Sequence, residues 1–273
     1  MDSMVKFWKM NGAGNDFVVV DNRDNSLNLS KKQIEQICQR QRGVGADGFL
    51  AVEPAQNGAD FRMRYYNADG GEAEMCGNGA RCFARFVNKL EGGTLQQTTF
   101  ETIAGVIRGE FMGDKVKVQL SAPFDLALGQ ELELAGESHT IHFVNTGVPH
   151  AVIFVDDVAE IDIVKLGAAV RYHDHFAPAG TNVNFVQILE PGLVQIRTYE
   201  RGVENETLAC GTGMVACSII YHEITDTPAP VQVKVAGGDI LEVNFDHTGS
   251  DMYENVTLLG SADFTFEGVL ESI

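Results

Sequence analysis

The chain has 273 residues, of which 44% are hydrophobic and 21% are charged, a composition typical of one or two globular domains with substantial cores. Its formal net charge of −18 argues against nucleic-acid binding, because so acidic a surface repels a phosphate backbone. No apolar stretch is long enough to span a membrane, and the first residues lack the apolar core of a signal peptide, so we expect a cytoplasmic protein that does not bind membranes.

The first half of the chain shows the patterns of a strand-rich domain built around one helix. In chain order they predict strands at 5–9 and 17–20, a helix from the Ser30 capping box to Gly43, strands near 48–53 and 60–66, a helix at about 78–90, and strands near 97–103, 106–112 and 115–121. The helix at about 78–90 is apolar over most of its circumference, which indicates that it is buried.

The second half repeats this order of elements. It predicts strands near 139–145, 150–155, 183–189 and 193–200, an apolar helix at about 211–223, and strands near 231–236, 239–245 and 254–259. The last run, 264–269, has no counterpart in the first half, and we expect it to cross back. The sequence therefore predicts an α+β fold of two pseudo-symmetric domains, residues 1–122 (with 264–273 packing back on them) and 123–263, each a strand-rich shell around a central helix.

One four-residue motif occurs in both halves. Residues 76–79 read Cys-Gly-Asn-Gly and residues 210–213 read Cys-Gly-Thr-Gly, an offset of 134 positions (210 minus 76). At the same offset Tyr65 falls on Tyr199 and Glu72 on Glu206. Two related domains would each present one thiol. Two thiols that face each other across a pseudo-twofold cleft could act on opposite faces of one carbon, as inversion of a stereocentre by proton transfer requires.

The position of each motif cysteine suits acid–base chemistry. Each follows a loop and immediately precedes an apolar helix, whose N-terminal N–H groups and partial positive charge stabilise a thiolate and bind an anion such as a carboxylate. A lone cysteine at such a position is more often a small buried residue, but two at equivalent positions of a repeat favour chemistry. The other three, Cys38, Cys82 and Cys217, are expected in the core. An odd set of five cysteines without CxxC spacing predicts reduced thiols, and neither a disulfide framework nor a cysteine zinc site.

Seven short motifs follow one another along nearly the whole chain. They are Lys-Met-Asn-Gly-Ala-Gly-Asn-Asp-Phe at 9–17, Asn-Ala-Asp-Gly at 67–70, Cys-Gly-Asn-Gly-Ala-Arg-Cys at 76–82, Gly-Val-Pro-His at 147–150, Thr-Asn-Val-Asn-Phe at 181–185, Tyr-Glu-Arg-Gly at 199–202 and Ala-Cys-Gly-Thr-Gly at 209–213. Together they resemble the diaminopimelate epimerase family, whose members are amino-acid epimerases independent of pyridoxal phosphate.

The resemblance implies two similar domains with the active site in the cleft between them. It implies conversion of LL-2,6-diaminopimelate to the meso isomer, on the route to lysine and peptidoglycan, with no metal or organic cofactor. Cys76 and Cys210 would be the base and acid, one removing the α-proton as thiolate and the other reprotonating the opposite face as thiol.

The resemblance also implies roles for other residues around this small-molecule amino-acid substrate. The distal amino-acid group needs amide and guanidinium donors and an oxygen acceptor, and the reacting carboxylate needs backbone N–H groups. Substrate contacts are implied for Asn15, Asn67, Asn182, Glu200 and Arg201, carboxylate contacts for Gly77, Asn78, Gly211 and Thr212, and tuning of the thiol pKa values for His150 and Glu200.

Three positions depart from the pattern of some relatives. Val148 stands where some carry an asparagine that contacts substrate, and Gly48 where some carry a glutamine. Phe266 stands where relatives use tyrosine at a dimer contact, so a homodimer is implied by the resemblance.

Two other classes of function fit parts of this pattern. A two-thiol racemase of the proline type would carry histidine in place of Asn78 and Ser-Pro before the second cysteine, where this chain has Leu208-Ala209; a histidine racemase would share more of the pattern. A non-enzymatic binding protein or thiol redox module would tolerate Cys76→Ala, which a two-base epimerase would not.

Overall fold

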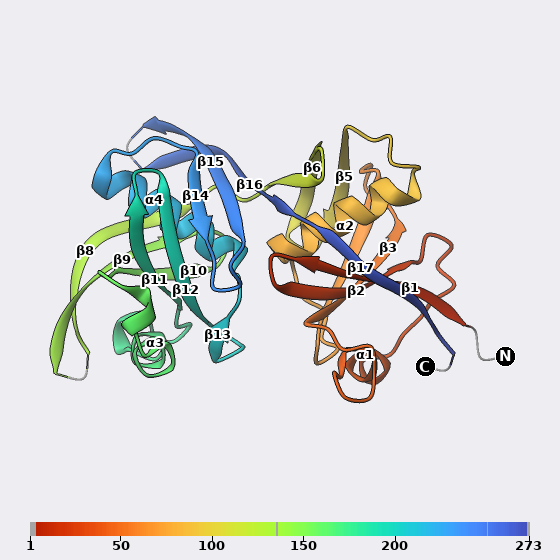
Figure 1. The fold of residues 1–273 in the computed structure, drawn as a ribbon, viewed down its shortest axis with the longest axis horizontal. Helices are drawn as coiled ribbons and strands as arrows, with labels where there is room; N and C mark the ends of the chain where they lie inside the picture. The colour runs from red at the N-terminus through yellow and green to blue at the C-terminus, as the bar shows by residue number, and fades with distance from the viewer. Residues whose placement is uncertain (1–3, 135, 250, 272–273) are drawn as a thin grey trace. The chain divides into compact units, whose positions relative to one another are not determined.

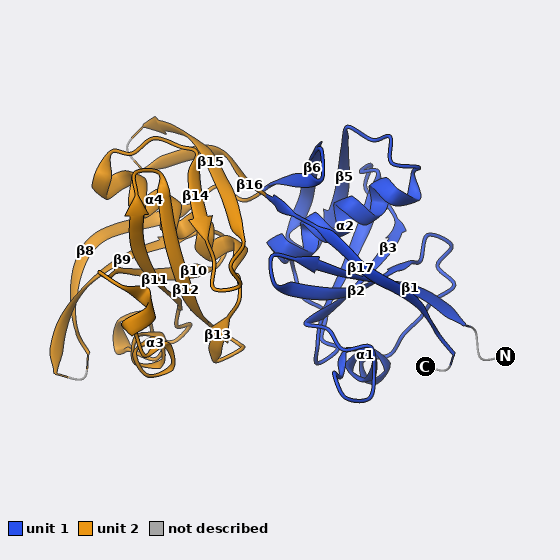
Figure 2. Cartoon of the chain, viewed as in Figure 1, with its two compact units in different colours: residues 1–119, 260–273 blue, residues 120–259 orange. Residues whose placement is uncertain are grey.

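The computed structural model describes residues 4–134, 136–249 and 251–271, and the chain forms two compact units (Figures 1 and 2). Unit 1 comprises Met1–Gln119 and Gly260–Ile273, and unit 2 comprises Leu120–Leu259. The backbone therefore passes from one unit to the other twice. Among the described residues, no helix is long and apolar enough to cross a membrane.

Unit 1 is a strand-rich shell around one long helix. Its elements are β1 (Val5–Gly12), β2 (Asn15–Asp21), α1 (Lys31–Cys38), β3 (Gly48–Pro54), β4 (Phe61–Asn67), α2 (Gly77–Leu90), β5 (Gln97–Thr102), β6 (Gly105–Met112), β7 (Lys115–Gln119) and, from the far end of the chain, β17 (Asp263–Leu270). Strand β17 pairs antiparallel with β1, and β1 with β2; β2 and β3 are parallel, β3 and β4 antiparallel, β4 and β5 parallel, and β5, β6 and β7 antiparallel.

Unit 2 has the same plan. Its elements are β8 (Phe124–Leu134), β9 (Glu137–Asn145), β10 (Pro149–Phe154), η1 (Val158–Glu160), α3 (Ile163–Arg171), η2 (Asp174–Phe176), β11 (Asn182–Glu190), β12 (Leu193–Glu200), β13 (Asn205–Thr207), α4 (Gly211–Thr225), β14 (Val231–Lys234), β15 (Ile240–Gly249) and β16 (Met252–Ser261), whose last residues belong to unit 1. Strands β8, β9 and β10 are antiparallel, β10 and β11 parallel, β11 and β12 antiparallel, β12 and β14 parallel, and β14, β15 and β16 antiparallel.

The two units thus repeat one order of parallel and antiparallel pairings. Strand β17 occupies in unit 1 the place that β8 occupies in unit 2. Strand β17 is the antiparallel neighbour of β1, which pairs with β2, and β8 is the antiparallel neighbour of β9, which pairs with β10. The duplication seen in the cysteine motifs therefore extends to the topology. The predicted α+β fold, two similar strand-rich domains around central helices, is confirmed.

The central helices are buried, as their apolar circumference predicts. Helix α2 packs against β1, β2, β3, β6 and β7, and α4 against strands β9 to β12, β14 and β15. Cys82 and Cys217 lie on these helices with no exposed surface, and Cys38 is also buried, which confirms their prediction as core residues. Burial raises the pKa of the Cys82 thiol to about 12, so this thiol is un-ionised at neutral pH. All five cysteines are free thiols.

Some predictions of secondary structure were wrong. Helix α1 ends at Cys38 and not at Gly43, because the backbone of Gln39 is already extended (ψ 121°). The elements β8, α3 and β13 were not predicted. Strand β8 has mostly exposed or half-buried residues without regular alternation, so its sequence carries little of the period-two signal. Strand β13 has only three residues.

Candidate active site

Cys76 is the N-cap of α2, and its backbone is extended while the next residue begins the helix (φ −141°, ψ 121°). Its Sγ accepts a hydrogen bond from the backbone N–H of Gly79, with an N···S distance of 3.5 Å. The sulfur therefore lies at the positive end of the helix macrodipole, next to N–H groups that have no partner within the helix. That position lowers the free energy of a thiolate relative to a thiol.

Asn15 lies beside this sulfur, at the start of β2. Its Oδ1 is 3.5 Å from Cys76 Sγ and 3.4 Å from the Nδ2 of Asn78. Its Nδ2 donates to the Asp47 carboxylate over 2.8 Å, which fixes the amide so that its oxygen points toward the thiol. Gly12 lets the hairpin approach this closely, because a Cβ there would lie 2.9 Å from the carbonyl oxygen of Asn78.

A partly buried ion network supports the hairpin, and the sequence did not predict it. The Asp16 carboxylate accepts two hydrogen bonds from Arg40, at 2.9 and 3.0 Å, and pairs with the buried Lys9 at 2.8 Å. Burial alone would raise the pKa of Asp16, but these cations and the backbone N–H of Asp47 outweigh it and lower the pKa to about 2. Arg40 also donates to Asp47, over 2.8 Å, and so ties the network to the partner of Asn15.

Arg81 lies beneath the first motif and is completely buried. Its guanidinium donates to the Asn78 side-chain oxygen (3.0 Å), the Ser261 carbonyl (3.2 Å) and the Gly77 carbonyl (3.4 Å). Because Asn78 Oδ1 accepts from this arginine, Asn78 Nδ2 is turned toward Asn15. Arg81 belongs to a motif quoted above, but its anchoring role follows only from the fold.

Asn67 lies at the same end of the strands as Asn15, as the pairing of β2, β3 and β4 shows. It ends β4 opposite Gly48 of β3, which in turn lies opposite Phe17 of β2. The Tyr65 hydroxyl donates to Asn67 Oδ1 over 2.8 Å. A Cβ on Gly48 would be 2.8 Å from both the Tyr65 ring and the Tyr66 carbonyl oxygen, so the Tyr65 ring fills the space that a longer side chain at position 48 would need.

Cys210 has the equivalent place in unit 2, as N-cap of α4. Its Sγ lies 3.6 Å from the Thr212 hydroxyl. The last glycine of the motif, Gly213, is tightly enclosed: a Cβ there would lie 2.5 Å from Asn184 Oδ1 and 3.4 Å from Cys210 Sγ. At Gly79 in unit 1 the nearest atoms would be 3.4 Å away, at an ordinary contact distance.

A chain of hydrogen bonds leads from the Thr212 hydroxyl into the core of unit 2. His150 Nε2 is 3.0 Å from Thr212 Oγ1, and His150 Nδ1 is 3.1 Å from Asn184 Nδ2. Asn184 Nδ2 also donates to the Ala151 carbonyl, and Asn184 Oδ1 accepts from the Thr198 hydroxyl, both over 3.0 Å. These two contacts fix the orientation of the amide.

The chain of hydrogen bonds defines the protonation of His150. Since an amide N–H₂ faces Nδ1, that ring nitrogen accepts and Nε2 carries the proton. Burial, and then the positive charge of Arg201, lower the pKa of His150 to about 3, so the ring is neutral at physiological pH. His150 therefore donates to Thr212 Oγ1, which leaves the threonine proton free to be donated to Cys210 Sγ.

One end of the paired strands β11 and β12, where β11 begins and β12 ends, carries Asn182, Glu200 and Arg201. Asn182 Oδ1 accepts from the Arg201 backbone N–H over 2.9 Å, and its Nδ2 donates to the Pro149 carbonyl over 3.1 Å. Glu200 accepts from the Thr207 hydroxyl over 2.8 Å, and the Arg201 guanidinium donates to the Ala179 carbonyl over 3.2 Å.

The loop before His150 is tied to the second motif. Thr146 donates through its hydroxyl to the Thr212 carbonyl over 3.0 Å, and through its backbone N–H to the Val148 carbonyl over 3.1 Å. Val148 is half-buried. Thr146 precedes the motif at 147–150 and was not predicted as a site residue.

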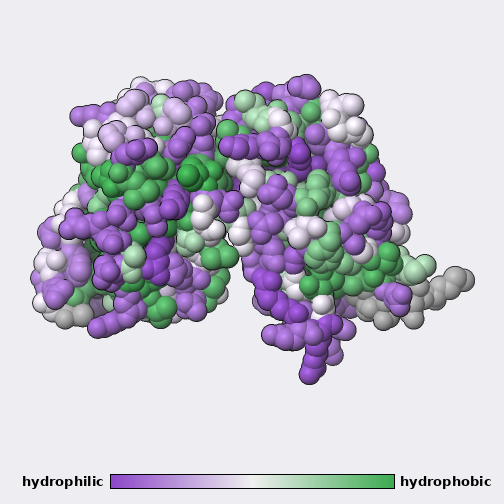
Figure 3. Space-filling view, viewed as in Figure 1, coloured by the Kyte–Doolittle hydropathy of each residue, from purple (hydrophilic) through white to green (hydrophobic). Residues whose placement is uncertain are grey.

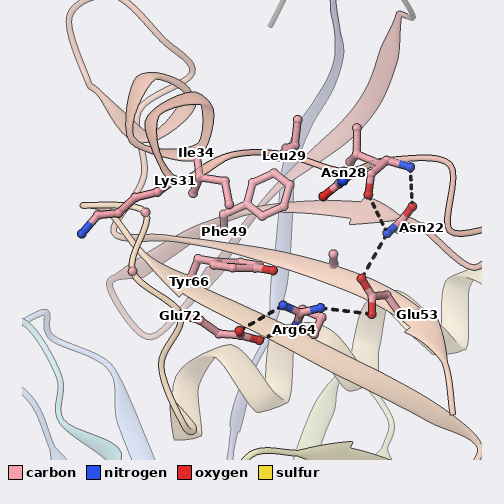
Figure 4. Close-up of a pocket in the computed structure, with 14 residues that line it drawn as sticks. Asn22, Asn28, Leu29, Lys31, Ile34, Phe49, Glu53, Arg64, Tyr66 and Glu72 are labelled. Carbon is pink, nitrogen blue, oxygen red and sulfur yellow. Dashed lines mark hydrogen bonds and ion pairs between the residues drawn. The ribbon is translucent and has the colours of Figure 1, made fainter. Parts of the chain in front are cut away.

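A separate hollow in unit 1 is not a candidate for this chemistry (Figure 4). Its wall carries the rings of Phe49 and Tyr66 and an ion-pair cluster in which Arg64 contacts both Glu72 and Glu53. Within the part of the chain that the structure describes, its lining includes none of the site residues predicted from the sequence. Arg62 also contacts Glu53, at 3.8 Å, so the two arginines and two glutamates of this cluster have no net charge.

Solved structures with a similar fold include a phenazine biosynthesis protein and a probable racemase. A PhzF-family phenazine biosynthesis protein from Bacillus anthracis aligns with a TM-score of 0.74 at 15% identity, over 98% of this chain and 99% of that one. A probable proline racemase from Agrobacterium radiobacter, solved with carbonate, aligns with a TM-score of 0.71 at 15% identity, over 97% and 92% of the two chains. The protein thus has the duplicated α+β fold of this class.

Its family follows from sequence similarity. The profile of the family "Diaminopimelate epimerase" matches residues 7–123 and 142–264. The diaminopimelate epimerase of Aquifex aeolicus is 44% identical over 97% of this chain and 98% of its own, and that of Hydrogenobaculum sp. is 42% identical over 96% and 97%. The chain belongs to the diaminopimelate epimerase family.

Proposed function

We propose that the protein converts LL-2,6-diaminopimelate to meso-diaminopimelate without a cofactor, in the synthesis of lysine and peptidoglycan precursors. Family membership supports the substrate. One observation supports the chemistry above all others: a cysteine is the N-cap of a buried helix twice, at equivalent positions of two units with one topology. We assign the two bases to Cys76 and Cys210.

The reaction needs one proton removed and one delivered on opposite faces of the α-carbon. One cysteine, as thiolate, takes the α-proton, and the electron pair passes into the α-carboxylate. The other cysteine, as thiol, gives its proton to the opposite face, so that the two sulfurs exchange protonation states in each turnover. Backbone N–H groups of Gly77 and Asn78, and of Gly211 and Thr212, would bind the carboxylate as its negative charge grows.

The surroundings of Cys76 suit a substrate that carries an ammonium group. Asn15 presents an amide oxygen next to the sulfur, held there because its nitrogen donates to Asp47. Such an oxygen accepts a hydrogen bond from an α-ammonium group beside the carbon that reacts. Arg81 holds Asn78 in place and so positions the start of the helix that would bind the carboxylate.

The surroundings of Cys210 suit a thiolate. The Thr212 hydroxyl can donate to Sγ because neutral His150 supplies the other hydrogen bond of that hydroxyl. In this account His150 tunes the thiol pKa through Thr212 and acts as a neutral donor. Glu200 remains a proposed substrate contact and tuning residue, supported by its place at the same end of the paired strands β11 and β12 as Asn182.

The distal amino-acid group of the substrate would be held by Asn67, Asn182 and Arg201. A guanidinium binds a carboxylate with two parallel hydrogen bonds, and amides can bind both carboxylate and ammonium groups. Asn182 is buried and accepts from the Arg201 backbone, so it orients the turn that carries the guanidinium.

The test is conversion of LL-diaminopimelate to the meso form by purified, reduced protein. Wild-type protein should convert it, whereas Cys76→Ala and Cys210→Ala should not; Cys38→Ala, which removes a thiol of the core, should retain activity if it folds. A folded, reduced protein without activity on diaminopimelate would reject the substrate. Activity on proline or histidine instead would favour one of the other racemases, and retained activity in Cys76→Ala would reject the two-base mechanism.

We propose further that the protein is a cytoplasmic homodimer. Strand β17 carries three exposed apolar residues, Phe264, Phe266 and Val269, and Figure 3 shows apolar side chains gathered over β1 and β17. Exposed apolar side chains that cluster on one strand suit contact with a second copy of the chain. The five free thiols suit a reducing compartment. Light scattering after gel filtration tests the dimer: a monomer would contradict it.

A further inference from the structure

Three potential metal ligands meet at the end of α4 that is remote from Cys210. His222 and Glu223 lie in the last turns of this helix, and His247 lies on β15. Each offers one ligand atom, and these atoms all lie within 4.8 Å of one another. A helix of 15 residues is about 22 Å long, so this cluster is separate from the catalytic end of α4.

The His222 imidazole is oriented as metal-bound histidines usually are. His222 Nδ1 is 2.8 Å from the Thr227 carbonyl oxygen, which can only accept, so Nδ1 carries the proton and Nε2 carries a lone pair. That Nε2 accepts a hydrogen bond from the Nδ1–H of His247 over 2.9 Å. A ring N–H donated to a backbone carbonyl, with the opposite nitrogen directed at the ion, is the common outer-shell arrangement of metal-binding histidines.

Outer contacts hold the other two residues in place. The Tyr253 hydroxyl donates to Glu223 Oε1, which leaves the second carboxylate oxygen to bind an ion. The Tyr253 ring stacks on His247, with centroids 4.8 Å apart and planes at 14°, and so fixes the plane of that imidazole. The three residues are held in this way by Thr227 and Tyr253, which are not themselves ligands.

The local electrostatics favour a cation. The carbonyl groups at the C-terminus of α4 give that end a partial negative charge, and Glu223 adds a full one. The formal net charge of the chain, −18, acts in the same direction. Glu223 and His222 are half-buried, so water screens these charges less than it would at an exposed site.

We propose that His222, Glu223 and His247 form a binding site for a divalent transition-metal ion of the zinc type. Tetrahedral bonds of 2.0–2.1 Å place neighbouring ligand atoms about 3.3 Å apart. The separations here, 2.9 Å between the imidazoles and at most 4.8 Å in the set, bracket that value. The proton of His247 would move to its Nε2, and water would complete the coordination. The ion would join α4 to β15 and so stabilise unit 2.

Zinc titration by calorimetry tests the site, in a Cys76→Ala, Cys210→Ala background so that the reactive thiols do not compete. Zinc should bind with one-to-one stoichiometry and raise the melting temperature, because an ion that binds only the folded state stabilises it. His247→Ala should weaken binding by at least roughly tenfold, since even loss of an outer-shell partner costs about that much. His175→Ala, which removes an exposed histidine of the same unit, is the matched control and should bind as the parent does.

Glu223→Gln is the second variant, because glutamine keeps an oxygen for Tyr253 but loses the charge. It should also weaken binding, and it keeps the test decisive if His247→Ala does not fold. The proposal is overturned if the parent shows no saturable zinc binding. It is equally overturned if both site variants bind as tightly as the parent, or if His175→Ala abolishes binding.

Discussion

Replacing Thr212 with valine should raise the pKa of the Cys210 thiol by roughly one unit. Valine keeps the shape of threonine but removes the hydroxyl that lies 3.6 Å from Cys210 Sγ. A hydrogen bond to a charged group contributes about 1.5–3 kcal/mol. Because the O···S distance is long, the low end of this range applies, and about 1.4 kcal/mol corresponds to one pKa unit. The thiolate should lose this stabilisation while the thiol is nearly unaffected.

The pH dependence of alkylation by iodoacetamide measures this change, because only the thiolate reacts at an appreciable rate. Mass spectrometry of the digested protein follows each cysteine separately. Cys76 lies in the other unit and serves as an internal control, and Cys82 should react slowly because burial raises its pKa to about 12. Thr212→Ser keeps the hydroxyl and should titrate as the wild type does.

The pH dependence of Cys210 alkylation, compared with that of Cys76, tests whether the hydrogen-bond chain ends on the sulfur. If Cys210 alkylates with the same pH dependence in Thr212→Val as in the wild type, Thr212 does not donate to the sulfur. The account of His150 as a neutral donor that acts through Thr212 would then be refuted. A shift of equal size in Thr212→Ser would refute it as well, because that variant retains the donor.

Three more variants test other parts of the account. Gly213→Ala should lower the free energy of unfolding by about 2 kcal/mol or more, because its Cβ would lie 2.5 Å from Asn184 Oδ1 and displace that buried amide. Gly79→Ala should be neutral or stabilising by up to about 1 kcal/mol. Urea unfolding measures both, and an equal loss of stability in the two variants would contradict this prediction. Asp16→Asn should lower the free energy of unfolding by about 2 kcal/mol at pH 7, because the pKa of Asp16 is about 2 in the folded state and 3.8 ordinarily. A lowered carboxylate pKa stabilises the fold at pH values above the unfolded-state pKa, so the difference in stability from wild type should shrink as the pH falls from about 4 to 2. A difference that does not change with pH would show that the charge of Asp16 does not stabilise the fold. Arg201→Met should raise the KM for diaminopimelate by roughly tenfold to a hundredfold, the equivalent of one charge-assisted hydrogen-bond pair, and unchanged kinetics would remove Arg201 from the distal site.

Features that depend on neighbouring residues could be predicted from the sequence. The Cys-Gly-X-Gly motifs before apolar runs indicate two buried helices, and the structure places both where expected, at Gly77–Leu90 and Gly211–Thr225. The core positions of Cys82 and Cys217 follow from the same apolar pattern. Helix starts and burial are local properties of the chain, so a single sequence expresses them.

Features that join distant parts of the chain could not be predicted in the same way. The contact of His150 with Asn184 and Thr212 requires a helix N-terminus and two parallel strands to be in register. Asn184 lies in a motif quoted for the family resemblance, yet nothing in that motif indicates that its amide fixes the protonation of His150. The Asp16 network likewise joins residues that are distant in the sequence.

The elements α3 and β8 were not predicted for a different reason. Helix α3 is short, and only three of its nine residues are buried, so its periodic signal is weak. Strand β8 is largely exposed, and its register with β9 shifts twice, which interrupts the alternation of side chains. In both cases the packing of unit 2, and not the local sequence pattern, stabilises the element.

Incorporation of solvent deuterium tests the central claim most directly. Reduced protein is incubated with LL-diaminopimelate in D₂O, and the stereochemistry and the α-deuterium content of the product are followed together. The account predicts meso-diaminopimelate with deuterium at the inverted α-carbon, and neither inversion nor sustained exchange in Cys76→Ala or Cys210→Ala. Inversion without deuterium, or inversion that persists in either variant, would contradict a mechanism in which two thiols exchange protons at one carbon.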